Sequence, residues 1–180
     1  MQKTKFVQIA ALAFAGVLSQ GAFAADGTIN FTGEIVDAPC SISPVSQNMT
    51  VPLGNVSRTA LDGAVGKKAP QPAKFTIDLL ACGATAKGAT VSFEGVPDSD
   101  DNTALTIVNA GAVGAARATG VAVELGDSNG TKIALGSESL EYILGEGDNA
   151  LKFQAVYVAT RPVVTVGPAD AVAQFTVNYK

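Results

Sequence analysis

Apolar and polar residues alternate along much of the chain with a period of two, which is typical of strands that bury one face. The segment 27–36, read GTINFTGEIV, sets Ile29, Phe31 and Ile35 against polar neighbours. A strand that opens a folded region has no earlier strand with which to form a hairpin. It must therefore pair with a distant segment or with another molecule. We interpret this segment as pairing with another molecule.

The same alternation predicts further strands, and Pro52 places the first of them at a sheet edge or a bulge. Asn129-Gly130 between two apolar runs predicts a hairpin. A single helical turn is expected over 57–61 with Ser57 as its cap, and a turn is expected over 145–149. The predicted strands are 49–56, 75–82, 90–95, 105–108, 121–125, 132–135, 140–144, 151–158 and 171–179.

Many short strands separated by turn residues, with no convincing long helix, favour an all-β fold, namely a single Ig-like β-sandwich. Composition agrees, because 47% of the residues are apolar and only 16% are charged. Loops are expected over 63–72, 97–103, 111–120 and 161–170. No internal repeat, linker or second domain is visible, so we expect one domain over 37–180 preceded by an extension over 25–36.

Residues 1–24 have the features of a secretory leader. Lys3 and Lys5 precede an apolar run over 6–18, and residues 22–24 form an A-x-A cleavage signal. The expected mature chain begins at Ala25, or a few residues earlier if cleavage follows Ala22. The run is too short to span a membrane, so an exported, soluble protein without membrane insertion is expected.

The expected mature chain is acidic, since ten basic and 16 acidic residues remain after the leader, a net charge of −6. This charge argues against nucleic acid and anionic lipid as partners.

The chain has two cysteines, and Cys82 lies 42 residues after Cys40. An even count in an exported chain predicts one disulfide, which on the chain-entropy model is worth roughly 4 kcal/mol. A free thiol pair or a metal site is the alternative, although no histidine or third cysteine exists to complete a metal site.

Catalytic patterns are weak. The chain has no histidine, which excludes a Ser-His-Asp triad and histidine metal sites. Asp98, Asp100 and Asn102 imitate the start of a calcium loop, but Thr103 and Asn109 stand where that loop needs Gly and Glu. The G-x-G-x-x-A pattern over 145–150 lacks a βαβ context. We therefore expect no enzyme, cofactor or metal.

The last predicted strand runs to the end of the chain, where most domains have a frayed tail. One interpretation is that a partner recognises this end and the free carboxylate of Lys180. The other is that the strand simply stops at its sheet edge, and the pattern alone favours neither.

Taken together, these features resemble the pilins of chaperone-usher fimbriae, close to the type 1 major subunits. The resemblance covers nearly the whole expected mature chain. It rests on the leader, the block GTINFTGEIVDAPC, Cys82 about forty residues on, Gly167 fourteenth from the end, Tyr179 as the penultimate residue, and the ending QFTVNYK.

The resemblance implies an Ig-like sandwich that lacks its final strand and leaves an apolar groove. In that family a periplasmic chaperone lends a strand and anchors the subunit's C-terminus. At the outer-membrane usher, the next subunit's extension then replaces the chaperone.

Mapped onto this sequence, the donor strand would comprise 25–32, with Ile29 and Phe31 as inserted side chains and Gly27 where no side chain fits. The strand bordering the groove and contacting the chaperone would contribute Ala173, Phe175, Val177, Tyr179 and Lys180. The strand beside it would contribute Leu151, Phe153, Ala155 and Tyr157.

The implied function is a structural subunit of a surface fimbria that supports cell adhesion. Its partners would be like subunits, the chaperone and the usher. Only 15 residues lie between Ala24 and Cys40, which is short for a major subunit and leaves a minor or adaptor subunit as an alternative. A stand-alone secreted β-sandwich binding module is a further, less favoured alternative function.

Overall fold

The computed structural model describes residues 27–33, 35, 38–108 and 116–180. The chain divides into two units, 1–36 and 37–180. In the first unit, residues 27–33 form neither helix nor strand, and the side chains of Ile29 and Phe31 are exposed. The predicted leader over 1–24 and part of the predicted loop over 111–120 lie outside the described residues.

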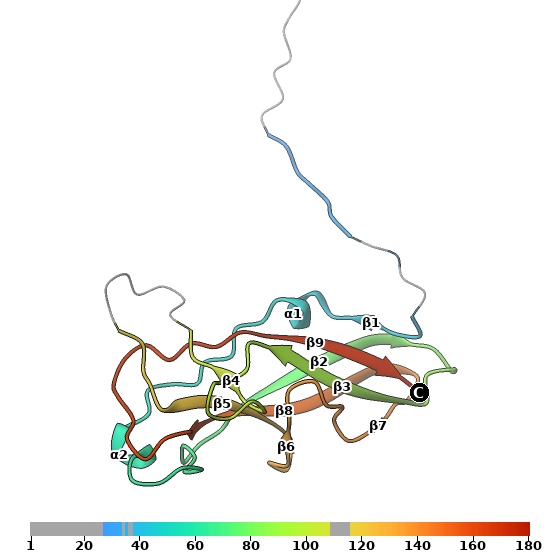
Figure 1. Cartoon of the computed structure of the whole chain (residues 1–180). Coiled ribbons are helices and arrows are strands. Elements are labelled where there is room, and N and C mark those ends of the chain that lie inside the picture. The colour runs from blue at the N-terminus through green and yellow to red at the C-terminus, as the bar shows by residue number, and fades with distance from the viewer. Residues whose placement is uncertain (1–26, 34, 36–37, 109–115) are drawn as a thin grey trace, which may run out of the picture. The chain divides into compact units, whose positions relative to one another are not determined.

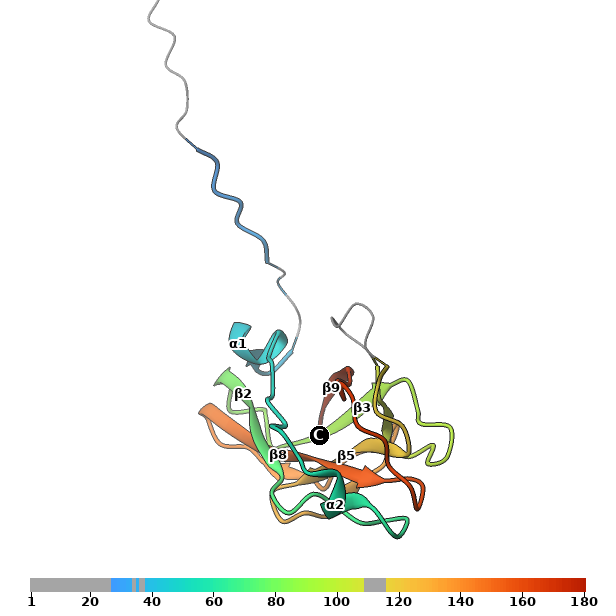
Figure 2. The same cartoon turned by 90° about the vertical axis from the view of Figure 1, so that its left-hand side faces the viewer.

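The second unit is a sandwich of two antiparallel sheets (Figure 1). The larger sheet has the order β1-β2-β8-β5-β4, and β6 also pairs with β5. The smaller has the order β7-β3-β9. Figure 2 shows β3 and β9 stacked over β5 and β8. The larger sheet contains β1 (Ser41–Ile42), β2 (Ala73–Cys82), β8 (Gly147–Ala159), β5 (Val121–Asp127), β4 (Leu105–Thr106) and β6 (Lys132–Ile133), and the smaller contains β7 (Tyr142–Ile143), β3 (Gly88–Gly95) and β9 (Ala173–Tyr179).

The core lies between the two sheets and is supplied by alternate positions of the strands. Phe153 of β8 stacks on Phe75 of β2 with ring centroids 5.7 Å apart, and it meets Phe93 of β3 edge-on at 5.1 Å. Burying each such side chain stabilises the fold by about 1.5–3 kcal/mol. The all-β sandwich expected from the alternation is therefore confirmed.

Asn129-Gly130 forms the predicted turn between β5 and β6. Gly130 has a φ of 90°, which favours glycine. The Asp127 carboxylate accepts the backbone N–H groups of Asn129 and Thr131, which fixes the turn.

The helical turn after Ser57 is confirmed as α2 (Arg58–Leu61), but the Ser57 hydroxyl caps no backbone group. It instead shares a hydrogen bond with the hydroxyl of Thr59, 2.8 Å away. A second short helix, α1 (Pro44–Gln47), and the two-residue strand β1 were not predicted. Both are too short to produce a periodic pattern.

Several predictions about element bounds are wrong, and the strands expected over 132–135 and 140–144 are each reduced to two residues. Residues 49–56 form no strand, since Pro52 has no N–H to donate and Gly54 adopts a φ of 71°. The strand expected over 105–108 is reduced to two residues. The turn expected over 145–149 ends early because β8 already begins at Gly147.

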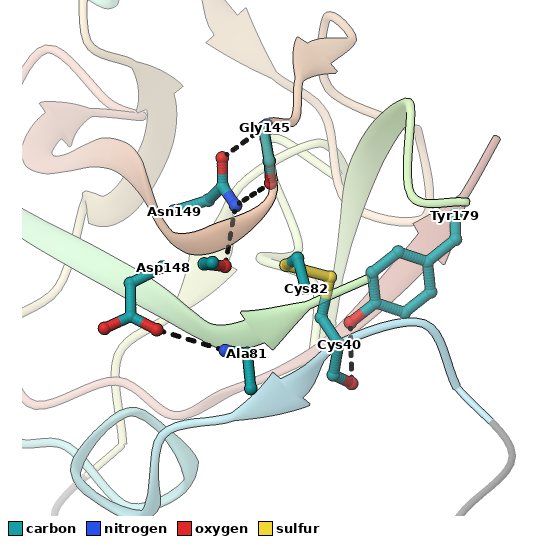
Figure 3. The surroundings of a disulfide bond; sticks show 8 residues. Cys40, Ala81, Cys82, Gly145, Asp148, Asn149 and Tyr179 are labelled. Carbon is teal, nitrogen blue, oxygen red and sulfur yellow. Dashed lines mark hydrogen bonds between the residues drawn. A yellow bond between two sulfur atoms is a disulfide. The ribbon is translucent and has the colours of Figure 1, made fainter. Parts of the chain in front are cut away.

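The predicted disulfide between Cys40 and Cys82 is present (Figure 3). Both cysteines are buried. The bond joins the residue before β1 to the last residue of β2. Among the described residues, no helix is long and apolar enough to span a membrane.

Candidate functional site

The last strand, β9, lies at the edge of the smaller sheet. It pairs with β3 through seven residue pairs, from Gly95 opposite Ala173 to Ala89 opposite Tyr179. Within the part of the chain that the structure describes, no strand pairs with its other edge. An unpaired edge exposes a row of backbone donors and acceptors that another strand can satisfy.

The segment 49–56 lies opposite this edge. Across the described residues, its backbone makes no hydrogen bond with other backbone groups. Met49, Leu53 and Val56 are partly buried against the core, so side-chain packing holds the segment in place. The unpaired edge of β9 and the backbone of 49–56, which has no ladder partner within the described residues, therefore border the same space.

That space is an apolar groove, which we call the β9 groove. Three cavities make it up, with volumes of about 160, 570 and 380 Å³. The first two share Leu53, Ala171 and Ala173, and the last two share Gly54, Tyr157 and Ala169, so the groove is continuous.

The groove is apolar because strands on both sides contribute their inward-facing positions. The floor of its first cavity includes Val123 and Leu125 of β5, Ala155 of β8 and Phe75 of β2. No charged side chain lines that cavity, while Asp170 borders the second and Arg58 the third. The seven residues 49–55 along one wall span ~23 Å when extended, at about 3.3 Å per residue.

Ala173 and Phe175, which were predicted for the groove strand, line the first cavity. Val177 and Tyr179 are partly buried against the core, beyond the cavities. The Tyr179 hydroxyl donates to the backbone oxygen of Cys40 over 3.4 Å (Figure 3). Burial raises the pKa of this phenol. The end of β9 thus contacts the residue that leads out of the extension.

The final residue is held at the sheet edge. The backbone N–H of Lys180 donates to the oxygen of Gly88 over 2.9 Å, and its ammonium lies 3.1 Å from a carboxylate oxygen of Glu138. Hydrogen bonds from Lys180 and then Thr90 lower the pKa of Glu138. Lys180 is therefore tied to β3 through Gly88 and to Glu138.

The assignment of β8 as the strand beside β9 is wrong. β8 pairs with β2 and β5 in the opposite sheet, and the neighbour of β9 is β3. Leu151 and Phe153 are core residues. Ala155 and Tyr157 reach the groove, but from its floor. The Tyr157 hydroxyl donates to the backbone oxygen of Ala169 over 2.6 Å and supports the groove wall.

Gly167 lines the third cavity and allows a close backbone contact. It has a φ of 157°, and a Cβ atom there would lie 2.3 Å from the backbone oxygen of Ala116. The neighbouring Ala118 N–H donates to the oxygen of Pro168 over 2.9 Å. Any larger residue at 167 would push these two segments apart.

Sequence reasoning missed the opposite wall, formed by Met49, Val51 and Leu53. Its alternation predicts a strand at a sheet edge or a bulge, but not a wall of the groove. The signal that it lacks a ladder was Pro52, together with Gly54 two residues later.

No cluster of three or more carboxylate, histidine or cysteine side chains that could hold a metal ion occurs among the described residues. In the loop that imitates a calcium site, Asp98 accepts the N–H groups of Asp100 and Asp101. Asp100 forms an ion pair with Arg161. These contacts are those of a surface turn.

The geometry defines a class of protein: an Ig-like sandwich with an open groove in place of a final strand. The family model "Fimbrial protein" matches residues 29–180. The chain is 39% identical to long polar fimbria protein A of Salmonella typhimurium, over 94% of each chain. It is 38% identical to the probable major fimbrial subunit LpfA of Escherichia coli O157:H7, over 100% of this chain and 98% of the relative.

Among solved structures, a chaperone-usher pilus aligns with a TM-score of 0.69 and 27% identity, over 87% of this chain and 96% of that one. The chain therefore belongs to the fimbrial protein family. It is a structural pilin, as its relatives are, and the family is not one of enzymes.

Proposed function

We propose that this pilin polymerises by donor-strand exchange, with residues 25–32 of one subunit filling the β9 groove of the next. The observation that carries the proposal is the unpaired edge of β9 and the backbone of 49–56 without ladder partners in the described part of the chain, on either side of an apolar floor. An inserted strand would satisfy both backbones and cover the floor.

The proposed donor matches the groove in length and pattern. Its eight residues span ~26 Å when extended, close to the length of the wall over 49–55. Ile29 and Phe31 share one face, so both side chains would enter the groove, and Gly27 would occupy a narrow point. Burying the two apolar side chains would contribute roughly 1.5–3 kcal/mol each, besides the main-chain hydrogen bonds.

A fibre follows from the separation of donor and groove. Each subunit offers its extension to one neighbour and its groove to another, which is a head-to-tail contact that need not close into a ring. The relatives include a probable major fimbrial subunit, so we assign this chain to the main shaft of a surface fimbria. A minor or adaptor position is the competing assignment.

Before assembly the open groove is an aggregation hazard, since it combines exposed apolar surface with unpaired edges. We propose that a periplasmic chaperone fills it first and binds the end of β9 at Lys180, and that an outer-membrane usher directs the exchange. Removing residues 178–180 is expected to lower the subunit's periplasmic level. Unchanged abundance would contradict the chaperone contact.

The test is fibre assembly in cells that express Phe31→Asp in place of the natural subunit. A charge on the inserted face is expected to abolish fibres, since burying an unpaired carboxylate is strongly unfavourable. The matched control is Thr32→Asp, which places the same charge on the opposite face and is expected to leave fibres of normal length. Normal fibres from Phe31→Asp would overturn the donor-strand assignment.

Electron microscopy of cells that lack only this subunit decides its position. Bald cells indicate the main subunit, whereas fibres of altered length or tip indicate a minor one.

A further inference from the structure

Between the extension and the groove wall the chain is weakly attached to the sandwich. Before Cys40, the oxygen of Pro39 accepts the N–H of Gly83. After Cys40, Ser41 and Ile42 pair with β2, the Ser43 N–H donates to the oxygen of Asp78, and the buried Ser46 hydroxyl accepts the N–H of Asp78. Beyond α1 come residues 49–56, without backbone hydrogen bonds among the described residues. The same stretch is one wall of the β9 groove.

A subunit within a fibre would be under tension between its extension and its groove. The pull on the extension enters the sandwich at residues 38–40. Without the disulfide, that pull would open the Pro39–Gly83 hydrogen bond, the two β1–β2 pairs and the two hydrogen bonds to Asp78 one after the other, and would then draw on 49–56. Bonds loaded in sequence break singly, at about 1 kcal/mol each. Losing the wall would release the neighbour's donor strand.

At Cys40 the pull can follow two routes, along the chain into β1 or across the disulfide into β2, since Cys40 is the last residue before β1. Its partner, Cys82, ends β2, which pairs with β8 through eight residue pairs. β8 in turn pairs with β5 through seven. A pull that crosses the disulfide therefore reaches the longest ladders of the larger sheet and bypasses the wall.

The corner that receives this pull is braced by side chains (Figure 3). The Asp148 carboxylate accepts the N–H of Ala81, next to Cys82, over 3.0 Å. The Asn149 side chain donates to the oxygens of Gly145 and Gly147 and accepts the N–H of Gly145. Asp148 therefore ties the end of β2 to the start of β8, and Asn149 holds the turn that leads into β8.

We propose that the Cys40–Cys82 disulfide is a mechanical clamp that diverts tension away from the groove wall. The proposal rests on the donor-strand function proposed above. It assigns the disulfide a role in holding the neighbour under load, separate from any contribution to folding stability.

The test uses two-subunit assemblies of the full expected mature chain, stretched with optical tweezers. One handle is on the neighbour, and the other is on the grooved subunit at Ala38, which is exposed and precedes Cys40. In assemblies whose grooved subunit carries Cys40→Ser with Cys82→Ser, we expect the rupture force to fall to roughly half or below, because a few bonds then open in sequence. An equal rupture force would overturn the proposal.

The matched control moves the handle to Ala84, an exposed residue two positions after Cys82. The pull then enters at the end of β2 whether or not the disulfide exists, so we expect equal rupture forces with and without it. An equal loss at Ala84 and Ala38 would mean that the bond only adds general stability, and would also overturn the proposal.

If the double serine variant does not assemble, wild-type assemblies formed under oxidising conditions are reduced with dithiothreitol and stretched from the same two handles. We expect reduction to lower the rupture force when the handle is at Ala38 and to leave it unchanged when the handle is at Ala84. Failure of the donor-strand proposal is distinguishable, because Phe31→Asp neighbours would then still form assemblies, whatever the rupture forces are.

Discussion

The outer face of β5 and the groove beside β9 show two ways in which this chain treats an apolar surface. All seven residues of β5 are buried, including those that face away from the core. Ala122 packs there with Ala104 and Val158 in a small second cluster. The groove, formed on the other side of the same strand, is left open.

Loops close the outer face of β5. Lys68 forms a bridge with Val158 of β8, and its ammonium pairs with the buried carboxylate of Glu124. Lys132 lies 3.5 Å from Glu124 and 2.9 Å from Asp101. A charge buried in this way is stable only because it is paired.

The difference teaches that the open groove is not caused by a shortage of covering chain. Loops and ion pairs cover the outer face of β5, whereas no strand among the described residues covers the part of its inner face that lies in the β9 groove. We therefore expect changes in the groove to affect assembly and changes in the outer network to affect stability.

The largest expected effect comes from filling the groove. Ala173→Trp places a large side chain between the walls, where Ala173 borders two of the cavities. Excluding one donor side chain forfeits about 1.5–3 kcal/mol, so we expect donor binding to weaken by about tenfold or more. Gln174→Trp, on the other face of β9, is the control. The measurement is the affinity of each variant for a neighbour's extension. Equal affinities in the two variants would contradict the groove assignment.

An intermediate effect is expected from Glu124→Ala. Breaking a buried ion pair costs about 3–5 kcal/mol, but Lys68 and Lys132 are 45% and 34% exposed and can turn to water. We expect the free energy of unfolding to fall by about 1–2 kcal/mol in denaturant titration, with fibre assembly unchanged. The control is Glu94→Ala, an exposed residue of β3. If Glu124→Ala abolished fibre assembly and left the free energy of unfolding unchanged, the outer network would serve assembly and not stability, which would contradict the comparison.

The smallest effect concerns the chain end and pH. Lys180 holds the pKa of Glu138 below its ordinary value of 4.5. The Glu138–Lys180 ion pair therefore holds the end of β9 fully at pH values above 4.5. This hold is lost as the pH falls through the lowered pKa of Glu138. Acidification should accelerate hydrogen exchange at the Lys180 N–H relative to Glu138→Gln, in which no carboxylate titrates. Identical pH profiles in the two proteins would rule out this tether.

Much of the sandwich was predictable because apolar and polar residues alternate along the sequences of β2, β3, β8 and β9. The placement of β8 was not predictable from this pattern. Alternation shows that Phe153 and Ala155 face the core, but a strand in either sheet satisfies that condition. Only the pairing of β8 with β2 and β5 decides between the sheets.

The groove was half predictable. The resemblance to pilins assigned Ala173 and Phe175 to the groove strand, and the alternation along β9 placed both on one face. The wall over 49–56 also alternates, and Pro52 and Gly54 indicate only that a ladder is interrupted there, so local sequence could not show that the whole segment lacks backbone partners. That property depends on where β2 and β9 end, which is set by the whole fold.

The most direct measurement is hydrogen exchange at the backbone amides of 49–56 and β9 in Phe31→Asp subunits, with and without a peptide of residues 25–36. The account predicts that the natural peptide slows exchange along both walls, while the same peptide carrying Phe31→Asp does not. Unchanged exchange along both walls with the natural peptide bound, or protection confined to other strands, would contradict it.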